Sequence, residues 1–349
     1  MWLLTLRDLQ WRRRRFVIAV LATAMAFAMS LLMSWVNARL HGEPGRIVAV
    51  LDTDAWVVEE GTSGPFTAST VISADLAETV AALPSVSAAQ PVVLLHSTMQ
   101  ARSVRDVNVI GLPVEGWGWP QIRHGRSPTG PGETVADIAA GLGVGDEVFL
   151  AGRRLVVVGT AAGVSYYFGA PTFLVPLADA QAIAFAGQPF ATAIATDGVP
   201  SSAPAGFQVL SPAEVEADLA RILESSTQTI GVLNALLIVM AAGIIGSIVY
   251  LSALERTRDF AVLKATGASS GALFAGLAAQ AVTLSLVAAV AGAALARFVL
   301  TPLIPFDVDL TASSFVTLAA TALAVGVLAS LAGLRRATGV DPALAFRAA

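Results

Sequence analysis

The sequence predicts an α-helical membrane protein with four transmembrane helices in a one-plus-three arrangement and an extracytoplasmic α+β domain between the first helix and the second. Three observations support this fold class. Of the 349 residues, 55% are hydrophobic and 13% are charged, whereas roughly a quarter of the residues in a soluble domain are charged. Four long runs carry no charged residue, and one extended polar segment separates the first run from the other three.

The four charge-free runs are residues 16–36, 230–254, 272–296 and 315–334. Each has the roughly 20 residues that a helix rising about 1.5 Å per residue needs to cross the hydrocarbon core. Lipid offers the backbone no hydrogen-bond partners, so each run is expected to be helical. A secretory signal is an alternative for the first run, but the apolar stretch of a signal has only about 7–15 residues. We therefore expect this span to be retained.

Positive charge is concentrated on one side of the predicted membrane. The lead-in segment 1–15, the elbow 255–271 between the second and third spans, and the tail 335–349 together hold 11 of the 21 Lys and Arg residues and 4 of the 25 Asp and Glu residues. Basic residues favour the cytoplasmic side. We expect a multi-pass protein of the plasma or inner membrane with both termini in the cytoplasm, and with segment 37–229 and the loop 297–314 outside.

The polar segment 37–229 shows the mixed pattern of an α+β domain. Alternating or β-branched runs predict strands at residues 47–51, 55–59, 92–95, 104–110, 147–150, 155–158, 172–175, 191–195 and 207–210. Helices are predicted at 74–83, 137–140 and 178–185, and loops at 111–120 and 126–132. The aromatic residues Trp117, Trp119, Tyr166, Tyr167 and Phe168 suggest a recognition surface, although ordinary packing of loop aromatics is the favoured interpretation.

The sequence lacks the patterns of a catalytic or metal site. The sequence has no Cys, and segment 37–229 has no Gly-x-Ser-x-Gly turn. The three histidines, His41, His96 and His124, are far apart. The single lysine, Lys264, is followed by Ala265, so the Gly-Lys-Ser/Thr of a P-loop is missing. We expect a non-catalytic chain with no cofactor or metal of its own and no nucleic-acid partner, and a tethered enzyme is the least favoured alternative.

A capping-box sequence precedes the second span. Ser211, Pro212 and Glu214 have the types and spacing of a helix start. No stop signal follows before residue 254, so we expect one stalk helix from about residue 212 to continue through the second span over roughly 64 Å. A break at residues 229–231 is the alternative.

The elbow 255–271 contains a short amphipathic helix. Phe260 and Leu263 share one face and charged residues surround it. Gly267 is a left-handed stop signal, and Ser269 or Ser270 can cap the next span. Such a helix fits a groove on a soluble partner, while a solvated loop is the alternative.

The same elbow resembles a known family. Residues 254–269 have the form Leu-Glu-Arg-x-x-Asp-Phe-Ala-Val-Leu-Lys-Ala-x-Gly-Ala-Ser, which is similar to the signature of FtsX-like, MacB-like permease subunits of ABC transporters. The start Leu6-Arg7-Asp8-Leu9, the ending Arg336-Ala337 with Val340-Asp341-Pro342, and the outer segments Gly125-Arg126, Gly132-Glu133, 142–148 and 156–159 also resemble the family. The likeness covers nearly the whole chain, with an FtsX-like permease domain at 230–349 and a MacB-like periplasmic core domain before it.

The resemblance implies a subunit that dimerises with a second permease chain and binds a separate ATPase, which would hold ATP and Mg. Mechanotransmission would then move the outer domain to export or extract a substrate. The expected ATPase contact comprises Glu255, Arg256, Arg258, Phe260, Leu263, Lys264 and Gly267. Membrane lipid is an expected partner, and a periplasmic adaptor or envelope protein is a further candidate. The alternative function is an ATPase-driven signalling subunit that regulates an envelope hydrolase.

Small residues recur four apart in two of the predicted spans. They are Ala242 and Gly246 in the second span and Ala288 and Gly292 in the third. This spacing allows close helix packing in a membrane, although a lipid-facing alanine in an alanine-rich chain gives the same pattern. We expect a helix interface at these four positions.

Overall fold

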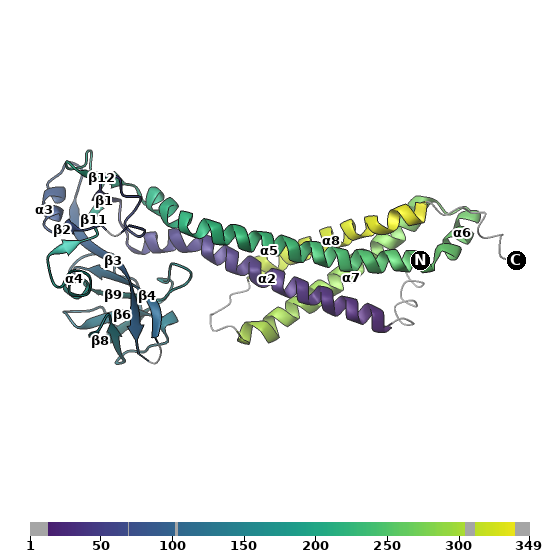
Figure 1. Cartoon of the computed structure of the whole chain (residues 1–349), viewed down its shortest axis with the longest axis horizontal. Helices are drawn as coiled ribbons and strands as arrows, with labels where there is room; N and C mark the ends of the chain where they lie inside the picture. The colour runs from purple at the N-terminus through teal and green to yellow at the C-terminus, as the bar shows by residue number, and fades with distance from the viewer. Residues whose placement is uncertain (1–12, 69, 102–103, 304–310, 339–349) are drawn as a thin grey trace. The chain divides into compact units, whose positions relative to one another are not determined.

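The computed structural model describes residues 13–68, 70–101, 104–303 and 311–338 (Figure 1). Most of the predicted lead-in segment and the end of the predicted tail lie outside these residues. Contacts within the chain divide it into two compact units. We call Arg39–Thr227 the sheet unit, and Met1–Ala38 with Gln228–Ala349 the helical unit. Helices α2 (Arg13–Val50) and α5 (Pro212–Glu255) contribute residues to both units.

The sheet unit is built on one sheet of ten strands. In spatial order nine of them run β12-β1-β11-β3-β4-β9-β6-β8-β5, and β7 pairs with both β3 and β8. Neighbours are antiparallel except β4 with β9 and β6 with β8. The ten are β1 (Ala55–Glu59), β3 (Ala88–Gln100), β4 (Val104–Leu112), β5 (Ile122–Gly125), β6 (Glu133–Asp137), β7 (Glu147–Leu150), β8 (Arg153–Ala161), β9 (Thr172–Pro176), β11 (Ala193–Asp197) and β12 (Phe207–Leu210). A separate pair joins β2 (Ile72–Ser73) to β10 (Phe190–Ala191).

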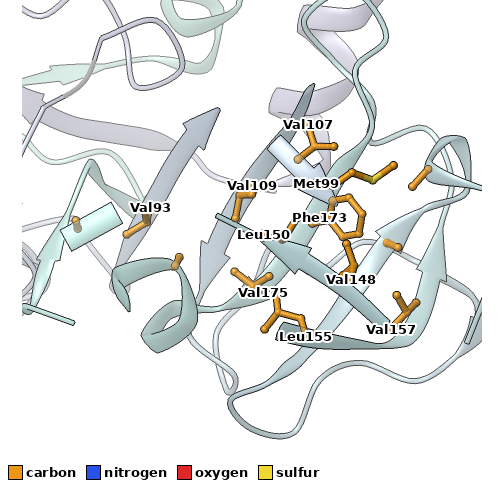
Figure 2. Packing of buried hydrophobic residues seen from close by; sticks show 14 of the residues in the cluster. Val93, Met99, Val107, Val109, Val148, Leu150, Leu155, Val157, Phe173 and Val175 are labelled. Atoms are coloured by element: carbon orange, nitrogen blue, oxygen red, sulfur yellow. The ribbon is translucent and has the colours of Figure 1, made fainter. Parts of the chain in front are cut away.

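Alternation along the strands gives the sheet two buried faces. In β1, Val57 belongs to one apolar cluster while Trp56 and Val58 belong to the other, as side chains of period two require. Helices α3 (Leu76–Ala81) and α4 (Leu177–Phe185) supply buried residues to the first cluster. Figure 2 shows its centre, where side chains from β3, β4, β7, β8 and β9 surround Phe173. The end of α2 and the start of α5 supply the second cluster, so helices cover both faces.

Residues 47–51 were predicted as a strand, but residues 47–50 form the end of α2 and Leu51 follows in a turn. Ile47, Val48 and Leu51 are all buried, and their spacing of one and four residues puts them on one side of a helix. The same short apolar run also satisfies a strand pattern, and Pro44 just before it is a common signal for a helix boundary. Packing on the sheet decides in favour of the helix.

Two strands of the sheet were missed in the sequence. The strand β5 has the sequence Ile-Arg-His-Gly and is half-buried to exposed throughout, so no apolar alternation marks it. The strand β6 is fully buried after Glu133 and lies between β8 and β9. Its partners are about 20 and 40 residues further along the chain, and such non-local pairing leaves no local signal.

An ion pair closes the loop between β5 and β6. The Arg126 guanidinium contacts both carboxylate oxygens of Glu133, with Nη1 2.8 Å from Oε2, and the Thr129 N–H donates to Oε2 at 2.7 Å. The hydrogen bond from Arg126 and then that from Thr129 lower the pKa of Glu133 to about 2. By contrast, burial raises the pKa of Asp137, which lies at the end of β6.

The helical unit contains long apolar helices that meet in one core. Besides α2 and α5 it includes α6 (Thr257–Ala265), α7 (Ser270–Leu295), a π-helical turn η2 (Ala296–Leu300), a 3-10 turn η3 (Thr301–Leu303) and α8 (Ala312–Thr338). Within the described residues, α2, α5, α7 followed by η2, and α8 are long and apolar enough to cross a membrane. Phe27, Val249, Leu277 and Val325, one from each of these helices, lie in the same buried cluster.

The capping signals read in the sequence are present in the structure. Glu214 accepts from the Ser211 N–H at 2.8 Å and the Ser211 hydroxyl accepts from the Glu214 N–H at 3.3 Å, which is a capping box. From Pro212 the helix α5 continues unbroken to Glu255, so the alternative break at residues 229–231 does not occur.

Candidate coupling site at helix α6

Helix α6 lies between α5 and α7 and is only nine residues long. It begins after Arg256, whose φ of −101° and ψ of 15° depart from helical values and separate α6 from the end of α5. Asp259 lies in its first turn and Lys264 in its last, which is the charge order that the helix dipole favours. Local chemistry therefore sets both ends of this short helix.

Gly267 terminates α6 in the left-handed region, with φ of +96°. The Ala268 N–H donates to the Leu263 carbonyl at 2.9 Å and the Gly267 N–H donates to the Lys264 carbonyl at 3.0 Å. This pair of bonds is a Schellman motif. Two residues later the Ser269 side chain accepts from the Ala272 N–H and caps α7. The predicted stop and the predicted cap are confirmed.

One face of α6 packs into the core of the helical unit. Phe260 is 7% exposed and Ala261 is fully buried. Phe260 belongs to the buried apolar cluster of the helical unit, and Leu263 is half-buried against this cluster. That cluster contains Ala253 near the end of α5 and Leu273 near the start of α7. The apolar face that the sequence assigned to a partner is therefore occupied within the chain itself.

The opposite face of α6 is exposed. Arg258, Asp259 and Val262 lie on it, and the Val262 side chain is 49% exposed. Residues 258, 262 and 266 follow one another at intervals of four, so they form a stripe along the helix. Val262 was missed in the sequence analysis. It could have been identified from the sequence as an apolar residue on the otherwise charged side of the helix.

The seven residues predicted to contact an ATPase differ in accessibility. Glu255, Arg258 and Gly267 are exposed, Arg256, Leu263 and Lys264 are half-buried, and Phe260 is buried. Their contact with a partner stays a prediction. Burial of Phe260 does change the design of a test, because a charge at this position would disturb the core before it could report on binding.

The four small residues predicted to pack between helices lie on two helices of the same unit. Ala288 is buried, and a Cβ added at Gly292 would lie 2.6 Å from the carbonyl oxygen of Ala24 in α2, so α7 approaches α2 closely there. Ala242 is half-buried and Gly246 is buried. Both line a shallow hollow between α5 and α8. The interface role of these residues stays a prediction.

Most of the aromatic residues singled out in the sheet unit are packed. Trp117 and Trp119 are half-buried. Tyr166 is 1% exposed, meets Phe66 edge-on at 5.4 Å, and has its pKa raised by burial. Phe168 is the exposed residue among the five, with half of its surface accessible. Across the part of the chain that the structure describes, no group of three or more His, Asp or Glu residues could hold a metal ion.

The chain matches two family models in succession. A model of the MacB-like periplasmic core domain matches residues 16–205, and a model of the FtsX-like permease C-terminal domain matches residues 231–342. The second match contains the whole of α6 and the elbow on either side of it.

Relatives of similar length share two fifths of the sequence. An ABC transporter permease of Mycobacterium bovis is 41% identical over 98% of this chain and 98% of its own length. Another, from Mycobacterium tuberculosis, is 40% identical over 98% of each chain.

Two solved structures align with part of the chain at low similarity. The periplasmic region of MacB from Actinobacillus actinomycetemcomitans covers 49% of this chain and 94% of its own, with 11% identity and a TM-score of 0.36. The extracellular domain of the ABC-type transporter YknZ from Gram-positive bacteria covers 45% and 99%, with 11% identity and a TM-score of 0.34. Because the family models and the permease relatives together span nearly all of the sequence, the chain belongs to the FtsX-like, MacB-like permeases of ABC transporters.

Proposed function

We propose that this chain is the non-catalytic transmembrane subunit of an ABC transporter and that α6 receives the force of a separate ATPase. The observation that carries the proposal is the construction of α6. This helix ends in a Schellman motif and has one face in the core and one face exposed. An ABC transporter permease requires an ATPase partner, and that partner would bind ATP and Mg.

The exposed face of α6 is the proposed contact. Val262 supplies an apolar side chain at its centre, and Arg258 and Asp259 supply charges of both signs beside it. Glu255, Arg256 and Lys264 flank this face along the chain. Phe260 and Leu263 have an indirect role, because they pack into the core of the helical unit and hold α6 against the other helices. Gly267 fixes where the helix ends.

Val262→Asp is expected to weaken binding of the ATPase that co-purifies with the tagged full-length chain by about tenfold, or roughly 1.4 kcal/mol. The reason is that the new carboxylate would lose its hydration in the contact. Binding is measured by titrating purified ATPase onto the chain in nanodiscs. Val199→Asp, at a site 58% exposed in the sheet unit, is the matched control and should bind normally. Equal binding by both variants would exclude this face of α6.

The proposed topology is one span, the sheet unit outside, and then three spans, with both termini and α6 in the cytoplasm. The distribution of Lys and Arg supports it. Since the chain has no Cys, Thr266→Cys at the exposed end of α6 and Val199→Cys in the sheet unit give unique labels. An impermeant maleimide should label position 199 in intact cells and position 266 only in opened cells. The reverse pattern would invert the topology.

The proposed work of the ATPase is to move the sheet unit and so export or extract a substrate, in a dimer with a second permease chain. Cells with a disabled ATPase should then retain a solute or lipid that wild-type cells release. Loss of activity of an envelope hydrolase, with no retained solute, would instead identify a regulatory subunit.

A further inference from the structure

Helix α2 contains the sequence Gly-Glu-Pro-Gly at residues 42–45, and these are the only Gly and Pro residues in the helix. Pro44 has no N–H, so the Leu40 carbonyl cannot receive the hydrogen bond that an α-helix would give it. Gly42 and Gly45 add flexibility on either side of Pro44, since Gly and Pro are the residues least favourable in a helix interior. The turn of residues 40–45 is therefore the weakest part of α2.

This weak turn lies beside the boundary between the two units, which falls in α2 between residues 38 and 39. After the turn, Ile47 and Val48 are buried in the second apolar cluster of the sheet unit. Before it, Phe27 and Leu31 are buried in the core of the helical unit. Because packing fixes α2 on both sides of the turn, any displacement of one unit against the other has to be accommodated between residues 31 and 47.

The contacts around the turn leave room for bending. A Cβ added at Gly42 would lie 3.7 Å from the Arg46 guanidinium, and one added at Gly45 would lie 3.0 Å from the Glu216 carboxylate. Both neighbours are the ends of long side chains, which can move aside, and neither is backbone. The closest approaches to the two glycines therefore do not prevent a change in the helix axis.

One ion pair supports the turn from the side. Arg39 and Glu43 are four residues apart, and Arg39 Nε lies 3.8 Å from Glu43 Oε1, across the turn that Pro44 weakens. This separation is longer than a hydrogen bond, and pairs at this spacing stabilise a helix only modestly. The turn is therefore helical on average, and its support is weak enough for thermal motion to bend it.

Helix α5 crosses the same boundary without such a segment. The boundary falls there between Thr227 and Gln228. Within ten residues on either side of it there is no Pro, and Gly231 is the single Gly. Since α5 keeps all of its backbone donors in this region, it is the stiffer of the two helices that join the units.

We propose that residues 42–45 of α2 are a hinge, at which α2 bends while α5 remains straight. Proline is among the usual causes of a sharp helix kink, and hinge movements are commonly absorbed by a few residues. The purpose of the hinge rests on the proposed function, in which the ATPase moves the sheet unit. A displacement of α5 carries the sheet unit with it, and α2 bends to follow.

Distances between two spin labels test the hinge without any ATPase, so the result is independent of the proposed coupling at α6. Because the chain has no native Cys, Met25→Cys in the helical unit and Val199→Cys in the sheet unit place one label in each, at side chains that are 51% and 58% exposed. Double electron–electron resonance on the full-length chain in nanodiscs gives the distribution of distances between the labels. A bend of about 20° at a proline, acting over the roughly 28 Å of helix between residues 25 and 44, displaces one label relative to the other by up to roughly 10 Å.

The distribution is expected to be broad in the labelled chain and to lose most of its width when Gly42→Ala and Pro44→Ala are combined. Gly231→Ala in α5, where no atom lies within 4 Å of the added Cβ, is the matched control and should leave the width unchanged. A distribution that is narrow from the start, or that the α2 variant does not narrow, overturns the hinge. Equal narrowing by the control also overturns it, because α5 would then bend as well. If the double variant does not fold, Gly42→Ala alone should narrow the distribution in part.

Discussion

Asp179→Ala is expected to lower the free energy of unfolding of the sheet unit by about 3 kcal/mol. Asp179 is fully buried at the start of α4. One of its carboxylate oxygens accepts from the Arg153 side chain in β8 at 2.7 Å, and the other accepts from the Gly132 N–H at 2.7 Å. Alanine would leave that N–H without its acceptor and remove the partner of Arg153. The loss falls at the lower end for a buried pair because Arg153, 41% exposed, can return to water.

The neighbouring arginine provides a matched control. Arg154 pairs with Glu147, but both side chains are at least 49% exposed, and surface pairs contribute little to stability. Glu147→Ala should therefore leave the free energy of unfolding nearly unchanged. Hydrogen exchange of the full-length protein in detergent measures both variants through the amides of β6, β8 and α4. Equal losses of protection in the two variants would mean that burial of Asp179 does not matter.

Gly292→Val is expected to destabilise the helical unit by about 1–3 kcal/mol, the usual range for overpacking. A Cβ at this position would meet the Ala24 carbonyl oxygen at 2.6 Å and the Phe27 Cβ at 3.0 Å. Real Cβ atoms do not approach backbone oxygen so closely, and the carbonyl cannot turn away without breaking α2. The two helices must therefore separate, which loses packing along both.

Gly243→Val is the control for the change in helix propensity. It introduces the same side chain in the middle of a helix, but no atom lies within 4 Å of the added Cβ. The midpoint temperature of thermal unfolding in detergent should thus fall substantially for Gly292→Val and little for Gly243→Val. If the two variants unfold at the same temperature, the close approach of α7 to α2 is not a source of stability.

The helices of this protein were largely predictable because the bilayer imposes a length and a composition on them. Ser211, Gly267 and Ser269 marked helix ends correctly, since caps and stops are local chemistry. The strand predicted at residues 47–51 was wrong because four or five apolar residues fit either period until a packing partner is known. The strand β6 was missed because its pairing with β8 and β9 is decided by residues far along the chain.

The candidate site was predictable in position but not in orientation. The sequence placed an amphipathic helix between two spans, and α6 is there. It could not show which face would remain accessible, because a bundle of apolar helices and a soluble partner both attract the same apolar face. In the structure Phe260 is buried and Val262 is exposed. The sequence of a nine-residue helix with three large apolar side chains does not show which of them will be buried.

The burial of Phe260 also bears on how stiff the elbow is. A helix joined to its neighbours only by loops could tilt freely, and a displacement applied to it would be absorbed at those joints. Phe260 and Leu263 instead share one interior with residues of α5 and α7, and protein interiors are nearly incompressible. A shift of α6 by a fraction of an ångström therefore forces the side chains packed around it to rearrange, because the close-packed interior has little free volume to absorb the displacement.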